Sequence, residues 1–359
     1  MNKRLIISFI LLLSLTAPAT AQDAAIPGAT APDPSSELLE SGVMPKPIKR
    51  VPPAYPKSLA RSGSEGWVQL SFVVGKDGAV LDPVVEDSSG FRGFEKEALK
   101  AIKKWQYSPA FVDGEAVEQC QQKVQLDFKL HETAKGVRRK FRSAYIAATD
   151  ALQANDLSLA SELTATLQAK KQWNSMESAW FWMLAADLAK AQGDEIAELA
   201  SINRALVTDG DGKLLGHDYF TVLLNRQFVL HTARANYAAA LDTFNRIETQ
   251  PDNQQNIDSL RPYAHKILAI LKSEQSIAVP GVIAVNGNWW HKLSRSALAL
   301  ANIKGELDTI ELRCHNRREV YSADSDSTWH IPASWGRCSV RVEGDPNSTF
   351  TLVELHWQT

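Results

Sequence analysis

The spacing of apolar residues changes twice along this chain, and that change limits the fold more than any other feature. Apolar and polar residues alternate in "WVQLSFVV" (67–74) and "KVQLDFKL" (123–130), which is the period of a β-strand. Between residues 133 and 276 the apolar residues recur every three or four positions, as in helices, and short alternating runs return after residue 277. A chain of 359 residues with two such changes is too long for one core and predicts a multidomain α+β protein.

The first 45 residues read as targeting and linker sequence. Lys3 and Arg4 precede an apolar run over residues 5–15, and Ala19-Thr20-Ala21 fits a signal-peptidase site, so residues 1–21 are predicted to be a signal peptide cleaved before Gln22. The apolar run is shorter than the roughly 20 residues that cross a bilayer. An uncleaved anchor in the inner membrane is the alternative. Residues 22–45 are rich in Ala, Pro, Ser and Gly and predict a flexible linker.

Residues 46–132 predict a small α/β domain. The turn "GKDG" (75–78) joins the first alternating run to "AVLDPVVEDS" (79–88), which indicates a β-hairpin. Pro83 cannot donate a backbone hydrogen bond, so the second strand should be an edge strand or contain a bulge. The stretch 93–107 predicts a helix with one apolar face formed by Phe94, Ala98, Ile102 and Trp105. The expected order is short helix, strand, strand, helix, strand.

Residues 133–276 predict a helical repeat domain. Three segments share a helix, a turn of small or polar residues, and a second helix, with turns at Asn155-Asp156, Gly193-Asp194 and Asn236-Tyr237. The turns recur at a loose period of about 40 residues, which favours αα-hairpins stacked as a tetratricopeptide-like solenoid. A further helix is expected over residues 260–272.

Residues 277–359 predict a β-rich, sandwich-like domain because several short alternating runs are separated by Gly, Asn, Asp and Ser. Cys314 and Cys338 lie in this region and are expected to form a disulfide, as an oxidising compartment allows. Cys120 is then expected to be a buried structural thiol, since no His or helix start lies nearby to lower its pKa.

The chain has no recognisable catalytic signature, so we expect no enzyme, no cofactor and no metal site. A formal net charge of −2 argues against a nucleic-acid partner. One local exception is "KGVRRKFR" (135–142), with five cations in eight residues. This run either contacts an anionic surface such as lipid headgroups or is the solvated start of a helix, and the second reading is favoured.

Three stretches of the α/β domain together resemble the C-terminal domain of the TonB family. They are "PPAYPKSLARSGSEGWVQLSFVVGKDGAV", "FEKEALKAIKKWQYSPA" and "DGEAVEQCQQKVQLDF". The shared features are Tyr55-Pro56 before a short helix, Glu65-Gly66 before a strand, a Gly-x-Asp-Gly turn, a helix closing on Trp105, and a final alternating strand. The resemblance covers about a quarter of the chain.

This resemblance implies a module in the periplasm of Gram-negative bacteria that binds the TonB box, a short N-terminal peptide of outer-membrane transporters. In the family the peptide adds a strand to the free edge of the last strand. Carried onto this sequence, the implied peptide-binding residues are Arg50, Val51, Pro52 and Tyr55, together with Val124, Gln125, Leu126, Asp127, Phe128, Lys129 and Leu130.

We therefore predict a periplasmic TonB-family protein that binds extended peptides by strand addition and serves TonB-dependent transmembrane transport. Its partner is a transporter peptide or another periplasmic protein, and a homodimer through strand edges stays open. Two alternatives remain. One is an inner-membrane-anchored energy transducer with an uncleaved N-terminal helix. The other is a periplasmic scaffold or assembly factor that acts through its helical repeats.

Overall fold

The computed structural model describes residues 44–112, 114–130, 136–170, 173–251, 253–325 and 327–356. The predicted signal peptide (1–21) lies outside these residues, as does nearly all of the predicted linker (22–45). Within the described part of the chain, no helix combines the length and the apolar character that crossing a membrane requires.

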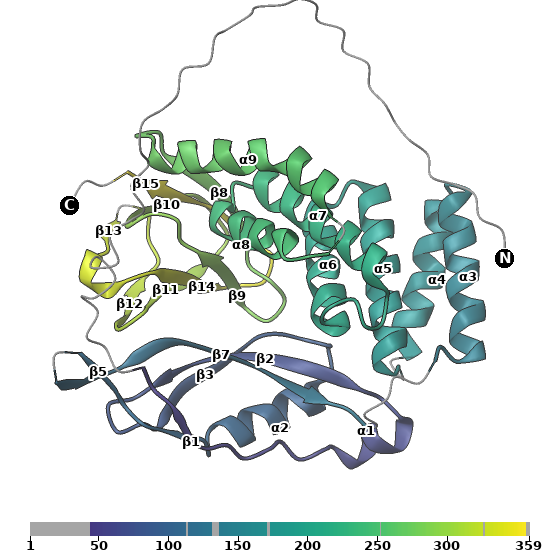
Figure 1. Ribbon diagram of the computed structural model, residues 1–359, viewed down its shortest axis with the longest axis horizontal. Coiled ribbons are helices and arrows are strands. Elements are labelled where there is room, and N and C mark those ends of the chain that lie inside the picture. Colours follow the sequence, from purple (N-terminus) through teal and green to yellow (C-terminus); the bar gives the residue numbers. More distant parts are fainter. Residues whose placement is uncertain are drawn as a thin grey trace, which may run out of the picture. The chain divides into compact units, whose positions relative to one another are not determined.

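The N-terminal α/β module (residues 44–130) is built on one antiparallel sheet with strand order β3-β2-β7, and helix α2 packs against one face of it (Figure 1). The predicted order of helix, strand, strand, helix and strand is confirmed. The sequence did not reveal four short strands, which pair as β1 with β4 and as β5 with β6. The elements are β1 (Pro47–Lys49), α1 (Lys57–Ser62), β2 (Gly66–Val74), β3 (Val80–Ser88), α2 (Arg92–Ile102), β4 (Gln106–Tyr107), β5 (Ala110–Val112), β6 (Glu115–Val117) and β7 (Gln119–Phe128).

The core of this module lies between α2 and the sheet, as the apolar periods predicted. Its members on β2 and α2 are Val68, Leu70, Phe72, Val74, Phe94, Ala98 and Ile102. Phe94 of α2 stacks on Phe128 of β7 with 4.2 Å between ring centroids. The expected helix over 93–107 was too long, because α2 ends at Ile102. The Trp105 N–H donates to the Ile102 carbonyl in the following turn, and its indole still reaches the core.

Strand β3 is the edge strand that Pro83 predicted. Its register with β2 shifts twice, between Gln69 and Leu70 and again between Ser71 and Val73. Asp82, next to the proline, has a positive φ of 43°. Because a proline offers no N–H to a ladder, an irregular edge strand is where it can be accommodated.

The Gly-x-Asp-Gly turn contains a glycine that no other residue can replace without distortion. Gly78 has a φ of +80°, and a Cβ on it would lie 1.9 Å from the carbonyl oxygen of Tyr107. That close approach exists because the Tyr107 N–H donates to the Gly78 carbonyl at 2.9 Å. By contrast, Gly63 has a similar φ of +69° with open space around it.

We expect Gly78→Ala to lower the free energy of unfolding by about 2–3 kcal/mol, because it combines left-handed backbone strain with a backbone clash. Gly63→Ala is the matched control, and it should lose only about 1 kcal/mol because it has the strain without the clash. Urea unfolding of the two variants measures the difference. Equal losses would show that the contact with Tyr107 does not constrain the turn.

The described part of residues 139–272 is helical apart from its turns. The turns predicted at Asn155-Asp156 and Gly193-Asp194 are confirmed, whereas Tyr237, expected in the third turn, begins α8. Helices pack in consecutive pairs, α3 on α4, α5 on α6 and α7 on α8. Tyr145, Trp180 and Tyr219 form edge-to-face contacts that connect α3 to α5 and α5 to α7. Stacking of the pairs as a tetratricopeptide-like solenoid stays a prediction. The bounds are α3 (Arg139–Gln153), α4 (Leu157–Lys170), α5 (Ser175–Gln192), α6 (Glu195–Asp209), α7 (His217–Ala233), α8 (Tyr237–Glu248) and α9 (Gln254–Lys272).

The C-terminal region forms two four-stranded antiparallel sheets, with orders β13-β10-β15-β8 and β12-β11-β14-β9, around a shared apolar core. The predicted disulfide is confirmed, since Cys314 of β11 and Cys338 of β14 are register partners joined by an S–S bond. The strands are β8 (Ile277–Val282), β9 (Asn288–Lys292), β10 (Ala297–Lys304), β11 (Leu307–Cys314), β12 (Arg318–Ser322), β13 (Thr328–His330), β14 (Cys338–Gly344) and β15 (Thr349–Leu355).

Cys120 is fully buried and outside any disulfide, as expected. Burial, reinforced by the charge of Glu118, raises the pKa of its thiol to about 12. The thiol therefore stays protonated at neutral pH and is a poor nucleophile.

Candidate functional site

The outer edge of β7 is the central feature of the predicted site. On one side β7 pairs with β2, with Leu70 opposite Val124 and Gly66 opposite Phe128. Among the described residues, no strand pairs with the other side. The Cys120 N–H at the beginning of β7 donates to the carbonyl of His315 at 3.2 Å, and this contact lies before the predicted segment. An edge of this kind presents backbone donors and acceptors to an incoming strand.

The side chains of β7 alternate as predicted. Leu126 and Phe128 are buried in the core of the module and Val124 packs against it. Gln125 and Asp127 are exposed on the opposite face of the sheet, where the Gln125 amide donates to the Asp127 carboxylate at 2.8 Å. The edge therefore has an apolar flank and a polar flank.

The predicted strand extended two residues too far. Lys129 and Leu130 lie beyond the end of β7, although their polar–apolar pattern continues the alternation. The Leu130 N–H donates to the Glu65 carboxylate at 3.0 Å, so a side chain takes the hydrogen bond that a ladder would otherwise use. Lys129 forms an exposed ion pair with Asp127 at 3.4 Å.

Glu65 connects the end of β7 to the start of α5. Its second carboxylate oxygen accepts hydrogen bonds from the N–H of Ser175 at 3.0 Å and from its hydroxyl at 2.9 Å. The Glu65 N–H donates to the Trp173 carbonyl at 2.9 Å. The Glu65-Gly66 pair was noted in the sequence, but the sequence could not predict the contact of Glu65 with Ser175, which lies 110 residues away.

The second group of predicted contact residues is Arg50, Val51, Pro52 and Tyr55, and the first two of these are anchored to the core of the module itself. The Arg50 guanidinium lies 5.1 Å from the centroid of the Trp105 ring, and the Trp105 indole N–H donates to the Val51 carbonyl at 2.8 Å. Pro52 is exposed. Arg50 and Val51 therefore contact the turn after α2.

Tyr55 is the member of that region that reaches β7. Its ring meets Phe128 edge-to-face with 5.9 Å between centroids, and its hydroxyl donates to the Ser64 carbonyl at 2.5 Å. Burial and the charge of Glu65 together raise the pKa of its hydroxyl to about 12. Tyr55 is therefore a neutral hydrogen-bond donor that fixes the end of the edge strand.

The polar face of the sheet is covered at β2 and β3 by later parts of the chain. The Trp67 indole N–H donates to Thr208 of α6 at 2.8 Å, and Arg204 of the same helix pairs with Asp87 at 3.0 Å. Farther along the sheet, Arg313 of β11 donates to the Ser71 hydroxyl at 3.2 Å. The module thus has one face on its own helix and the other on the helical and C-terminal regions.

Residues 51–130 match the family of Gram-negative bacterial TonB protein C-terminal domains. The resemblance inferred from the sequence is confirmed for the α/β module, which we call the TonB-like module (residues 44–130). Proteins of this family transduce energy and bind other proteins, and they are not enzymes.

Individual TonB proteins are similar to a part of this chain. Protein TonB of Pseudomonas aeruginosa is 34% identical over 84 residues, which are 23% of this chain and 24% of that protein. Protein tonB2 of the same organism is 37% identical over 79 residues, 22% of this chain and 29% of that protein. The solution NMR structure of the P. aeruginosa TonB C-terminal domain is 31% identical and covers 25% of this chain and 90% of that domain, with a TM-score of 0.23. The chain thus spans about a quarter of the length of the curated relatives it matches.

A cavity of about 230 Å³ lies between the polar flank of β7 and the helices. Its lining includes Gln125, Asp127 and Lys129 of the TonB-like module, Ser175 at the start of α5, and Asp209 at the end of α6. Burial raises the pKa of the Asp209 carboxyl. The helices therefore form a second wall beside the exposed side chains of the edge strand.

Proposed function

We propose that the TonB-like module binds extended peptides by strand addition to β7 and that the protein serves TonB-dependent transport from the periplasm. The proposed partners are N-terminal TonB boxes of outer-membrane transporters. The observation that carries the proposal is the outer edge of β7 from Val124 to Phe128, which has no strand partner in the described part of the chain. The match of residues 51–130 to the TonB C-terminal family supports it.

A guest strand on this edge would have two different environments for its side chains. Alternate residues of a strand point to opposite faces of a sheet. One set would lie next to Gln125 and Asp127, beside the cavity that α5 and α6 wall off. The other set would lie beside Val124 and Leu126, on the face that α2 covers. Backbone hydrogen bonds would supply affinity, and the walled flank would supply selectivity.

We expect N-methylation of a bound peptide to act at every second position. The experiment is a titration of the full chain with a synthetic TonB-box peptide. Two N-methyl groups on residues whose backbone N–H points toward β7 should weaken binding about 10-fold or more, since each lost hydrogen bond contributes about 0.5–1.5 kcal/mol. The same groups on the other set should have little effect. Calorimetry gives the affinities, and NMR shifts of the amides of residues 124–128 locate the site. Equal effects of the two sets would contradict strand addition.

The scaffold alternative is favoured by exposed apolar side chains on α7. Tyr219, Val222 and Val229 are 49%, 52% and 55% exposed, and helical spacing places them on one face. Exposed apolar patches of this kind often bind proteins. Tyr219→Glu with Val222→Glu should abolish capture of a partner from periplasm if α7 is the binding surface. The same double variant should leave peptide binding unchanged if the edge of β7 is the binding surface.

The anchored-transducer alternative depends on residues 1–21. Mass spectrometry of the mature protein separates it from the proposed periplasmic form. A chain that begins at Gln22 has lost the anchor, whereas a chain that retains Lys3 and Arg4 with the apolar run keeps it.

A further inference from the structure

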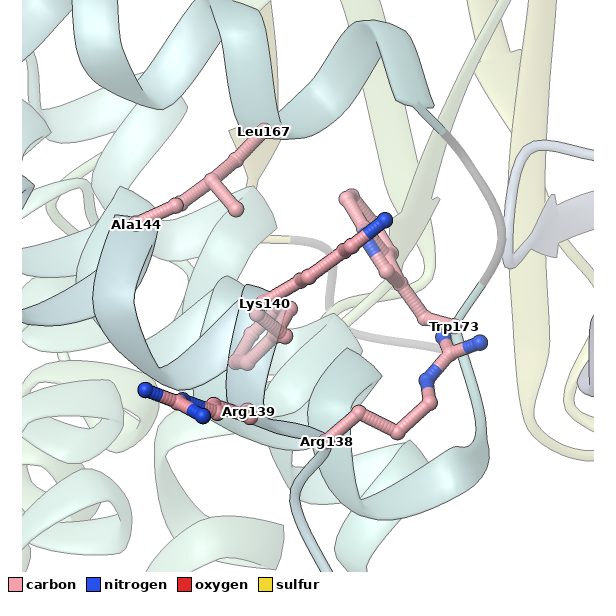
Figure 2. A pocket seen from close by; sticks show the side chains of 7 residues that line it. Arg138, Arg139, Lys140, Ala144, Leu167 and Trp173 are labelled. Carbon is pink, nitrogen blue, oxygen red and sulfur yellow. The ribbon is translucent and has the colours of Figure 1, made fainter.

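A cavity of about 580 Å³ opens at the start of α3, within the basic run that the sequence singled out (Figure 2). Pockets of 300–1,000 Å³ are the usual size for small-molecule sites. The lining residues are Arg138, Arg139, Lys140, Phe141, Ala144, Leu167 and Trp173. This cavity is separate from the edge of β7 and is not used by the proposed function.

The inner wall of the cavity is apolar and already in place. Phe141, Leu167 and Trp173 are each buried, with 6%, 2% and 6% of their surface exposed. Trp173 stacks on Phe181 with 4.3 Å between centroids and meets Phe141 edge-to-face at 6.4 Å. Because these rings are held by their neighbours, an apolar ligand would enter a preformed wall without ordering new side chains.

Exposed positive charge lies at the mouth of the cavity. Arg138 is engaged, because its Nε donates to the buried carboxylate of Glu177 at 2.9 Å. Arg139 and Lys140 are exposed, and neither forms an ion pair with another described residue. Among the described lining residues none is acidic.

The backbone at the start of α3 is already paired with a carboxylate. Helix α3 has no acidic residue in its first turn, and its N-cap residue, Arg138, makes no side-chain cap. The buried carboxylate of Glu177 accepts the Arg138 N–H at 2.8 Å, so one anion already lies at the positive end of this helix dipole and the exposed attraction comes from Arg139 and Lys140. In the view of Figure 2 the side chain of Lys140 extends across the opening toward Trp173, and that of Arg139 points the other way.

We propose that this cavity binds an anionic amphiphile, a single apolar chain with a carboxylate or phosphate head. The head would pair with Lys140, whose side chain extends toward Trp173, and the chain would lie against Leu167 and Trp173. A small inorganic anion would leave the apolar wall uncovered, and an uncharged apolar ligand would leave Lys140 unpaired. The combination of wall and rim selects a ligand with both properties.

Equilibrium dialysis of the full chain with radiolabelled hexadecanoate, kept below its micelle concentration, tests the proposal. We expect one bound molecule per chain. Hexadecanol should bind at least about 10-fold more weakly, since it lacks the charge-assisted hydrogen bonds of the head. Inorganic phosphate should not compete. Equal binding of the acid and the alcohol, or no binding of either, would overturn the proposal.

Variants separate the two halves of the site. Arg139→Gln with Lys140→Gln should weaken hexadecanoate binding at least 10-fold, and Ala144→Phe should abolish it by filling the cavity. Lys103→Gln with Lys104→Gln is the matched control, because it removes two exposed cations after α2. Circular dichroism melting checks that each variant folds. Unchanged binding by Ala144→Phe, with a native melting curve, would exclude the cavity.

A second arm distinguishes a free amphiphile from a lipid bilayer. Flotation with phosphatidylglycerol vesicles measures bilayer binding, and intermolecular NOEs from the hexadecanoate methylenes to the Trp173 indole measure occupancy of the cavity. NOEs that vanish in Ala144→Phe support the proposal. Vesicle binding that needs Arg139 and Lys140 but survives Ala144→Phe, without NOEs, would overturn it in favour of a surface contact.

Discussion

Glu311→Ala is expected to lower the free energy of unfolding by about 3–5 kcal/mol, the loss typical when one member of a buried ion network is removed. Glu311 is 2% exposed and accepts hydrogen bonds from Arg313 Nε at 2.8 Å and Arg341 at 2.9 Å, and also pairs with Arg318. Burial alone would raise the pKa of this carboxyl, but the neighbouring arginines, Arg313 foremost, lower it below its usual value. Without the carboxylate, Arg313 keeps a buried charge and loses its ion pair with Glu311.

Glu319→Ala is the matched control for this prediction. Glu319 is on the neighbouring strand β12 and pairs with Arg317, which is 58% exposed, at 2.6 Å. Exposed pairs of this kind contribute about 0–1 kcal/mol. Urea unfolding should therefore separate the two variants by at least 2 kcal/mol. Similar losses would mean that the network around Glu311 is not what stabilises this sheet.

The same variant tests how the TonB-like module is held. Arg313 donates to Ser71 at 3.2 Å and to the Asp82 carbonyl at 3.4 Å, so Glu311 indirectly orients the contact between β11 and the sheet. Hydrogen exchange of the β2 amides should accelerate in Glu311→Ala and stay native in Glu319→Ala. Protection that is unchanged in both would show that contacts on α6, such as that of Trp67, suffice to hold the sheet.

Elements with a local apolar period could be predicted from the sequence. The alternation of β2 and β7, the helix face of α2 and the turns between paired helices depend on residues a few positions apart. The Cys314–Cys338 pair was also accessible, because both cysteines lie in one short strand-rich region. Pro83 alone was enough to predict an edge strand, because a proline has no backbone N–H to donate.

Contacts between regions could not be predicted, because they join side chains far apart in sequence. Trp67 meets Thr208 across 141 positions and Ser71 meets Arg313 across 242. The apolar–polar pattern around Trp67 and Ser71 does not identify their contact partners. The alternation of apolar and polar residues in a strand also does not show whether the polar face contacts solvent or protein. The coverage of this face is therefore a result of the structure.

The alternation of β7 was predicted from the sequence, and the end of the strand was not. The exposed edge followed from the family resemblance, and the alternation of Val124 to Phe128 placed the right residues inward. Leu130 continued the apolar pattern, so the sequence extended the strand. Glu65 captures the Leu130 N–H instead, and no local rule predicts a hydrogen bond across 65 positions.

Stability is expected to fall between about pH 6.5 and pH 4 because of His231. This side chain is 7% exposed on α7, and burial lowers the pKa of its imidazole to about 4, with smaller effects from His291 and Arg234. The unfolded chain, with a pKa of about 6.5, binds the proton more readily in this range. Folding therefore becomes less favourable as the pH decreases, by about 3 kcal/mol at pH 4.

The contribution of His231 can be isolated by comparing variants across pH. His231→Gln removes the titration, so its stability should decrease by about 3 kcal/mol less than the parent between pH 7 and pH 4. His265→Gln is the control for the loss of one imidazole, because His265 is exposed on α9 and its replacement leaves the core intact. Urea unfolding at pH 7, 5.5 and 4 gives the profiles. Parallel profiles for the parent and His231→Gln would mean that the imidazole accepts a proton in the folded chain as readily as in the unfolded one.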